Sequence, residues 1–402
     1  MKKFIVAAMM VLGATSAFAG DSDALKAIMK AKTYAEAEAL VKQNLGQLAN
    51  DQEKAKAYNK LVDLGMKIYN DQQSIIQTNQ IMKKNDPVDE KAMNEGAYNA
   101  LINAIECNKY DQLPDAKGKV KPKFADSNAA RVWGARIQLV NAGQTAAQNN
   151  QSDNVLKYWG TFLDTEDSPL FAAKTKEKES EKEYLGQVAL FAARYAYQAK
   201  DQARCEKYCD IAMKDEKQAK DALNLKLYAL KDGLKTHADS LAYVDKLKGL
   251  YAQDNKNDVI LDNLNTMYSS LNMEKEQMDL LQGVIDRDAN NYVALANMGT
   301  IYIKKNDADN AIKYLKQAAT VKPDNVVVLT YLGACYNSKA GALQDPNGRK
   351  VVYQEAMKVL DKAKELDPEK AQANWGYTRY QAYYGYYGPT AAETKKAEEE
   401  SK

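Results

Sequence analysis

The sequence predicts an all-α protein, a right-handed superhelix of stacked antiparallel helix pairs, and three observations lead to this fold class. Only 20 glycines and 8 prolines occur in 402 residues, so few positions interrupt a helix. Apolar residues recur at helical spacing through most of the chain. In the C-terminal half, residues of the same type recur at a fixed interval of 34 residues, which is typical of a repeat architecture.

The repeat is visible in four sets of residues. An interval of 34 separates the members of each set: Leu261, Leu295 and Leu329; Leu264, Met298 and Leu332; Tyr268, Tyr302 and Tyr336; Gly299 and Gly333. Chance rarely produces one interval in so many registers. A unit of this length has room for two helices joined by a turn.

Each unit has the character of two packed helices. The first helix presents an apolar stripe at i, i+3 and i+7, formed by Leu295, Met298 and Tyr302. Gly299 lies beside this stripe and lets a neighbouring helix approach. The second helix presents a small, a large and a small residue, which are Ala311, Leu315 and Ala318. Pro323 then ends it, because a helix interior cannot easily accept a residue without an N–H.

The interval changes once, from 34 to 45 residues. The change is shared by four pairs: Ala311 and Ala356, Leu315 and Leu360, Ala318 and Ala363, Pro323 and Pro368. Eleven residues are therefore inserted between Tyr336 and Ala356. Glycine, proline and asparagine in this stretch predict a loop over 337–349 with a turn at 345–348.

A 34-residue helix-turn-helix unit with these residues resembles the tetratricopeptide repeat. The two units that begin near Leu295 and Leu329 match best, whereas the unit before them departs from the pattern at Asn265 and Gln277. The resemblance implies a non-catalytic scaffold that holds a protein or peptide in a concave groove. It places the following residues in the groove: Asp262, Thr266, Ser269, Ala296, Thr300, Lys304, Thr330, Ala334 and Asn337. The alternative is that this face only meets solvent.

The sequence further predicts how the chain is divided. Residues 20–183 form an N-terminal helical region with divergent helix pairs, and residues 184–388 form the repeat array with a capping helix. Alternating charges over 174–183 predict an exposed helix face. Residues 389–402 are too polar to pack and are expected to be a disordered tail.

The first nineteen residues predict export. Lys2 and Lys3 are followed by an apolar stretch over 4–12 and by the small-x-small sequence Ala17-Phe18-Ala19. This pattern is typical of a cleaved signal peptide. The length and the flanks of the apolar stretch do not fit the alternative, an uncleaved membrane anchor. We expect a periplasmic protein or, second, a secreted one. Stable membrane insertion is not expected, because no later run approaches the roughly 18 apolar residues of a membrane span.

Charge and cysteine usage exclude several classes of partner and cofactor. With 56 Lys+Arg and 54 Asp+Glu the chain has no basic excess for nucleic acid. Its four cysteines are too few for a disulfide framework, and Cys205 and Cys209 lie one helical turn apart. Their Cβ atoms would be about 5–6 Å apart, wider than the roughly 3.8 Å of a disulfide. We therefore expect the cysteines to be packing residues, and we expect the protein to bind no metal and no cofactor.

No catalytic arrangement is apparent. A triad would have to include His237, the sole histidine, which lies in a stretch that reads as a turn. No glycine-rich phosphate loop is present. Carboxylates such as Glu166 could still meet others across the fold, which keeps an enzyme as a minor alternative.

The region 375–387 is unusually aromatic, with one tryptophan and six tyrosines. A capping helix needs only one apolar stripe to cover the last repeat. The other rings are either part of the same cap or available to bind a partner. Exposed tyrosines suit peptides or sugars. Tyr383 and Tyr386 are therefore candidate binding residues, and the alternative function is a glycan- or cell-wall-binding accessory protein.

Overall fold

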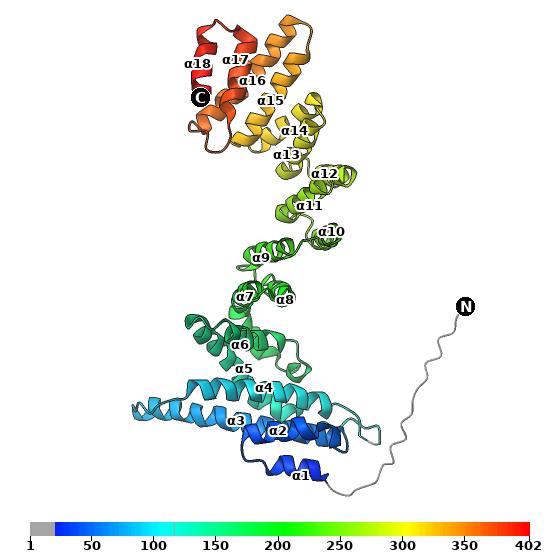
Figure 1. The fold of residues 1–402 in the computed structure, drawn as a ribbon, viewed down its shortest axis with the longest axis vertical. Helices are drawn as coiled ribbons and strands as arrows, with labels where there is room; N and C mark the ends of the chain where they lie inside the picture. Colours follow the sequence, from blue (N-terminus) through cyan, green and yellow to red (C-terminus); the bar gives the residue numbers. More distant parts are fainter. Residues whose placement is uncertain (1–20, 116) are drawn as a thin grey trace, which may run out of the picture. The chain divides into compact units, whose positions relative to one another are not determined.

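The computed structural model describes residues 21–115 and 117–402. The predicted signal peptide, residues 1–19, lies outside them. The described chain consists of 18 α-helices and two short 3₁₀ helices, without a strand in these ranges (Figure 1). Neighbouring helices pack against one another along the chain. The all-α fold of stacked helix pairs is confirmed.

The chain divides into two compact units, residues 1–232 and 233–402. The boundary predicted at 183/184 is wrong, because helix α7 (Thr175–Gln198) runs through it without a break. The charged stretch that suggested an exposed face forms the first half of this helix. One of its carboxylates, Glu181, is buried rather than exposed, and holds the helix to the core.

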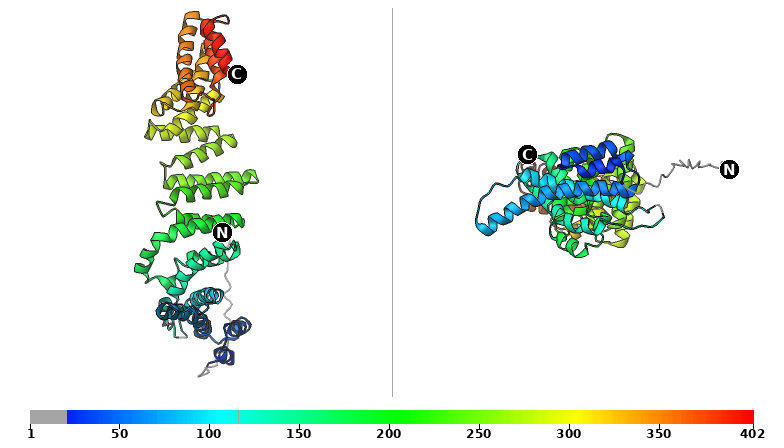
Figure 2. Two further views of the ribbon diagram at one scale, coloured as in Figure 1. Left: turned by 90° about the vertical axis from the view of Figure 1, so that its left-hand side faces the viewer. Right: turned by 90° about the horizontal axis from the view of Figure 1, so that it is seen from below.

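The first unit contains a long helical hairpin. Helix α3 (Asp51–Met82) and helix α4 (Glu90–Asp111) lie side by side in Figures 1 and 2. Gly65 and Gly96 allow this contact, because a Cβ atom on Gly65 would lie 2.9 Å from the backbone nitrogen of Ala100. Two short helices pack against α3, namely α1 (Asp23–Lys30) and α2 (Tyr34–Asn44).

Further helices continue the first unit from this hairpin: α5 (Ala125–Gln148), α6 (Ser152–Asp164), α7, α8 (Gln202–Ala212) and α9 (Ala219–Asp232). Small residues line the contact between α7 and α8. Cys205 and Cys209 are buried there as free thiols, as are Cys107 and Cys335 elsewhere. Their prediction as packing residues is confirmed.

The second unit contains nine helices of the described chain: α10 (His237–Gln253), α11 (Asp258–Ser270), α12 (Glu274–Arg287), α13 (Tyr292–Lys304), α14 (Ala308–Val321), α15 (Val326–Ala342), α16 (Pro346–Leu366), α17 (Trp375–Tyr387) and α18 (Ala392–Ser401). The 34-residue period is confirmed in these bounds. Helices α11, α13 and α15 begin 34 residues apart, and so do α12 and α14.

The insertion is placed correctly, but its predicted structure is wrong. Helix α15 has 17 residues against 13 in α13, and α16 has 21 against 14 in α14. The eleven extra residues therefore lengthen both helices, and only residues 343–345 connect them. Pro346 misled the prediction, because proline is also well suited to the first turn of a helix. Asp345 caps that turn by accepting hydrogen bonds from the backbone of Asn347 and Gly348.

The predicted disordered tail is a helix. In α18, Thr394 and Ala397 are buried against α17. The hydroxyl of Thr394 donates to the carbonyl of Gly388 at 2.8 Å. Glu400 accepts a hydrogen bond from the Arg379 guanidinium at 2.7 Å. Polar composition misled the prediction, since only one small stripe of this helix needs to pack.

Candidate functional site

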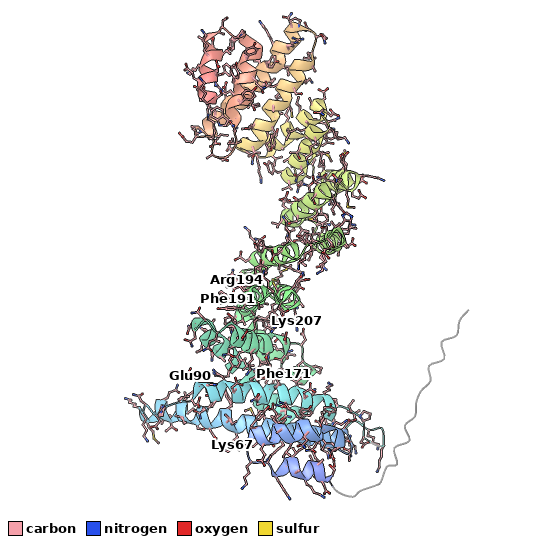
Figure 3. All side chains as sticks on the ribbon, in the orientation of Figure 1. Lys67, Glu90, Phe171, Phe191, Arg194 and Lys207 are labelled. Atoms are coloured by element: carbon pink, nitrogen blue, oxygen red, sulfur yellow. The ribbon has the colours of Figure 1, made fainter. Side chains whose placement is uncertain are left out.

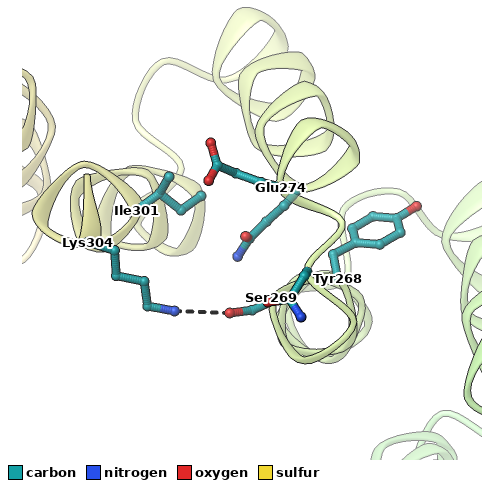
Figure 4. Close-up of a pocket in the computed structure, with 7 residues that line it drawn as sticks. Tyr268, Ser269, Glu274, Ile301 and Lys304 are labelled. Carbon is teal, nitrogen blue, oxygen red and sulfur yellow. Dashed lines mark hydrogen bonds between the residues drawn. The ribbon is translucent and has the colours of Figure 1, made fainter. Parts of the chain in front are cut away.

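Two residues predicted to face the groove meet at a small cavity. It has a volume of about 150 Å³ and lies where α11, α12 and α13 approach one another. The Lys304 ammonium points across it and donates to the Ser269 hydroxyl at 3.0 Å (Figure 4). The cavity is lined by Tyr268, Ser269, Asn272, Glu274, Gln277, Ile301 and Lys304.

The repeat geometry places these groups together. Ser269 and Lys304 lie near the ends of equivalent helices, one period apart, so their side chains emerge at the same level. A cation at a helix C-terminus is favoured by the helix dipole. Lys305 next to it forms an ion pair with Glu274, and that hydrogen-bonded carboxylate raises the pKa of Lys305. Buried Ile301 supplies an apolar wall.

The remaining predicted residues of α11 and α13 lie on the same accessible face. Asp262 and Thr266 are exposed. The Asp262 carboxylate accepts from the Asn297 amide at 3.4 Å, which links the two helices. Thr300 is half-buried, and its hydroxyl donates to the carbonyl of Asn297 at 2.8 Å. This face therefore offers acceptors and one ammonium donor.

Thr330 does not belong to this face. Its side chain is buried and its hydroxyl donates to the Val326 carbonyl one turn earlier at 2.8 Å. The prediction took Thr330 as the equivalent of Ala296, one period earlier. In the longer helix α15, however, this position is covered by its neighbours. As a candidate binding residue Thr330 is therefore wrong.

A second cavity lies further along the array. It has a volume of about 300 Å³ and is formed by residues of α15, α16 and α17: Ala334, Asn337, Ser338, Tyr353 and Gln381. Ala334 and Asn337 were predicted to face the groove, whereas Tyr353 and Gln381 were missed. The Asn337 amide nitrogen donates to the Thr378 carbonyl at 2.8 Å, which ties α15 to α17.

The tyrosines of α17 divide into a half-buried and an exposed set, and the two named candidates belong to the half-buried set. Tyr383 and Tyr386 are half-buried. The hydroxyl of Tyr383 donates to Asp361 at 3.0 Å, and the Arg379 guanidinium lies 4.3 Å from its ring centroid. The exposed rings are Tyr377, Tyr384 and Tyr387. The helix thus caps the array and still leaves rings in solvent.

Sequence reasoning also missed a buried ion cluster in the first unit. The Arg136 guanidinium is fully buried, pairs with Glu181 and lies 2.6 Å from Glu166. Three aromatic rings surround it, the closest being Phe162 at 4.2 Å from the ring centroid. Nothing in the spacing of these residues along the chain signals the cluster. On the surface of the same unit, Arg194 lies over the exposed ring of Phe191 on α7 (Figure 3).

Two features of the described residues bear on metal binding and on nucleophilic chemistry. No group of three or more histidine, cysteine, aspartate or glutamate side chains is arranged to hold a metal ion in ranges 21–115 and 117–402. Burial raises the pKa of the Cys107 thiol to about 12 and that of Cys335 to about 11, so neither is a ready nucleophile. No helix of these ranges is both long and apolar enough to cross a membrane.

Comparisons with known proteins add little to this geometry. The sequence matches no family model. It also matches no curated protein. Among solved structures it is similar to the crystal structure of MamA protein, with 17% sequence identity and a TM-score of 0.32 over 47% of this chain and 94% of that one. A likeness of this size supports no inference about function.

Proposed function

We propose that this chain is a non-catalytic scaffold of the bacterial envelope that holds a protein or peptide partner along the groove face of α11 and α13. The observation that carries the proposal is the cavity between Ser269 and Lys304. It joins an ammonium donor, hydroxyl and amide groups and a buried apolar wall at the ends of two equivalent helices.

The chemistry of this cavity suits an extended peptide segment. A peptide carboxylate is a better acceptor for Lys304 than the neutral Ser269 hydroxyl, because it adds an opposite charge to the hydrogen bond. Glu274 and Gln277 line the same cavity and offer acceptors for backbone N–H groups. The Ile301 wall accommodates a small apolar side chain. Recognition by a few polar groups on a partly apolar surface is typical of protein interfaces.

The proposed compartment rests on the N-terminal sequence. A basic start, a short apolar stretch and Ala17-Phe18-Ala19 are typical of a secretory signal peptide. Separation of the periplasmic and extracellular fractions, followed by N-terminal sequencing of the mature protein, tests this part. A mature chain that still begins at Met1 would contradict it.

The partner proposal is tested by site-specific crosslinking in intact cells. A photo-reactive residue at Thr300 or Lys304 is expected to capture a defined protein, identified by mass spectrometry. The same residue at Lys316, an exposed position on α14, is the control. Equal capture from all three positions would contradict the proposal.

Charge reversal then tests the role of the ammonium group. With the captured partner purified, Lys304→Glu is expected to weaken binding about tenfold, because a donor becomes a repelling acceptor. Lys316→Glu makes the same change of charge away from the cavity and is expected to bind as the unaltered protein does. Loss of binding in both variants would show a general effect of net charge instead.

A further inference from the structure

The cavity between α15, α16 and α17 has the features of a site for a small neutral ligand. None of its five lining residues, Ala334, Asn337, Ser338, Tyr353 and Gln381, carries a charge. Its volume of about 300 Å³ is at the lower end of the range of about 300–1,000 Å³ for ligand pockets. A compact ring fits a space of this size better than an extended chain does.

One polar atom of this cavity has no partner. The Asn337 amide oxygen is buried and accepts no hydrogen bond from the described residues. Its orientation is fixed, because the amide nitrogen of the same side chain donates to the Thr378 carbonyl. Buried acceptors are nearly always satisfied in native proteins. The described residues supply no donor to this oxygen.

Two exposed aromatic rings flank the cavity. Tyr377, Gln381 and Tyr384 lie at i, i+4 and i+7 of α17 and so share one face of the helix. Gln381 lines the cavity, and the two tyrosines are 59% and 47% exposed on either side of it along the helix. Tyr353 contributes a further ring, which packs against Gly385, where any Cβ atom would collide with it.

We propose that this cavity binds one or two rings of a neutral saccharide. The C–H face of a pyranose stacks on the electron-rich face of a tyrosine ring. Its hydroxyl groups both donate and accept, so they can pair with Ser338 and Gln381, two exposed polar side chains of the lining. The uncharged lining disfavours acidic or amino sugars, which would lose hydration without gaining an ion pair. The site shares no residue with the cavity at Lys304, so the two proposals stand or fall separately.

The test is calorimetric titration of the full chain with cellotetraose, maltotetraose and fully N-acetylated chitotetraose, all neutral, and with anionic tetragalacturonate as the charged counterpart. At least one neutral sugar is expected to bind. Gln381→Ala is expected to weaken it about fivefold, as for one ordinary hydrogen bond. Tyr384→Ala is expected to weaken it about tenfold. Both side chains are exposed, so the fold should persist, which circular dichroism checks.

The matched control is Tyr228→Ala, since Tyr228 is 60% exposed but lies on α9 of the first unit, outside the helices that form the cavity. It is expected to bind the sugar as the unaltered protein does. Three results would overturn the proposal. One is no binding of any neutral sugar up to about 10 mM, another is equal weakening by Tyr228→Ala, and the third is tighter binding of tetragalacturonate.

Discussion

At the scale of single residues, two glycines decide how closely the paired helices approach. A Cβ atom on Gly299 would lie 2.6 Å from Cγ of Leu315, and one on Gly333 would lie 2.5 Å from Cγ of Leu360. Each leucine belongs to the second helix of its pair and is fully buried. The glycine and leucine therefore form one packing unit that recurs with the repeat. The sequence alone predicts the positions of this unit, because Gly299 and Gly333 keep the 34-residue period and Leu315 and Leu360 share the single change to 45 residues.

Gly299→Ala is expected to destabilise the second unit by about 1–3 kcal/mol, the usual cost of overpacking a core. Gly283→Ala is the control, because its added Cβ meets only the end of a flexible Arg287 side chain at 3.9 Å. That change in the middle of α12 is expected to stabilise by about 0.5–1 kcal/mol. Urea unfolding followed by circular dichroism measures both. If both substitutions changed the free energy of unfolding in the same direction, the packing argument would be contradicted.

A different residue-scale effect arises at Glu181, which shares the Arg136 guanidinium with Glu166. Burial raises the pKa of the Glu181 carboxyl above its ordinary value of 4.5, and the neighbouring carboxylate adds to the shift. The folded state therefore holds this proton more tightly than the unfolded chain does. The resulting stabilisation is present below pH 4.5 and is lost as the pH rises through the folded pKa.

The free energy of unfolding of the unaltered protein, relative to Glu181→Gln, is therefore expected to fall as the pH rises from about 4 to 7. Glutamine cannot ionise and is spared the cost of a buried charge. Glu179→Gln, at an exposed carboxylate on the same helix, controls for the change in net charge. The free energy of unfolding, measured at several pH values, gives the difference between the unaltered protein and each of the two variants. A relative stability that rises with pH would show that the Arg136 ion pair dominates instead.

At the scale of elements, the sequence predicts the bounds of a helix where residues of the same type recur at a fixed period. The bounds of α11 to α14 follow from the 34-residue period, since leucine, tyrosine and alanine mark each packed face. The eleven inserted residues have no period, so composition alone suggested a loop where Asp345 and Pro346 start a helix. The prediction of a disordered tail over 389–402 was wrong for the same reason. Arg136 and Glu181 meet across 45 residues, and no local pattern predicts such a contact.

Helix α18 can be tested by placing a charge in its contact with α17. Ala397→Glu buries a carboxylate at a position 1% exposed, whereas Ala392→Glu makes the same change in solvent. Because an unpaired buried charge is costly, the first variant is expected to release the helix and the second to leave it docked. Limited proteolysis with mass spectrometry measures cleavage within 389–402. Equal cleavage of both variants would restore the prediction of a disordered tail.

At the scale of the whole molecule, each unit contains a large apolar core. The large apolar core of the first unit runs from Val62 to Ala229, and that of the second from Leu261 to Ala382. Neither cluster draws a residue from the other unit. The two cavities and the exposed tyrosines of α17 all belong to the second unit. Partner and sugar binding, and the effects of the substitutions that weaken them, are thus expected to depend on residues 233–402.

A fragment of residues 233–402 is therefore expected to fold by itself. Its helices bury their apolar stripes against neighbours inside the same range, and stacked repeats gain stability from such nearest-neighbour contacts. Circular dichroism should show a helical spectrum and one cooperative thermal transition, and Gly299→Ala should lower the midpoint of that transition. The fragment should also keep the sugar or partner affinity of the full chain. A disordered fragment would show that the second unit needs the first to fold.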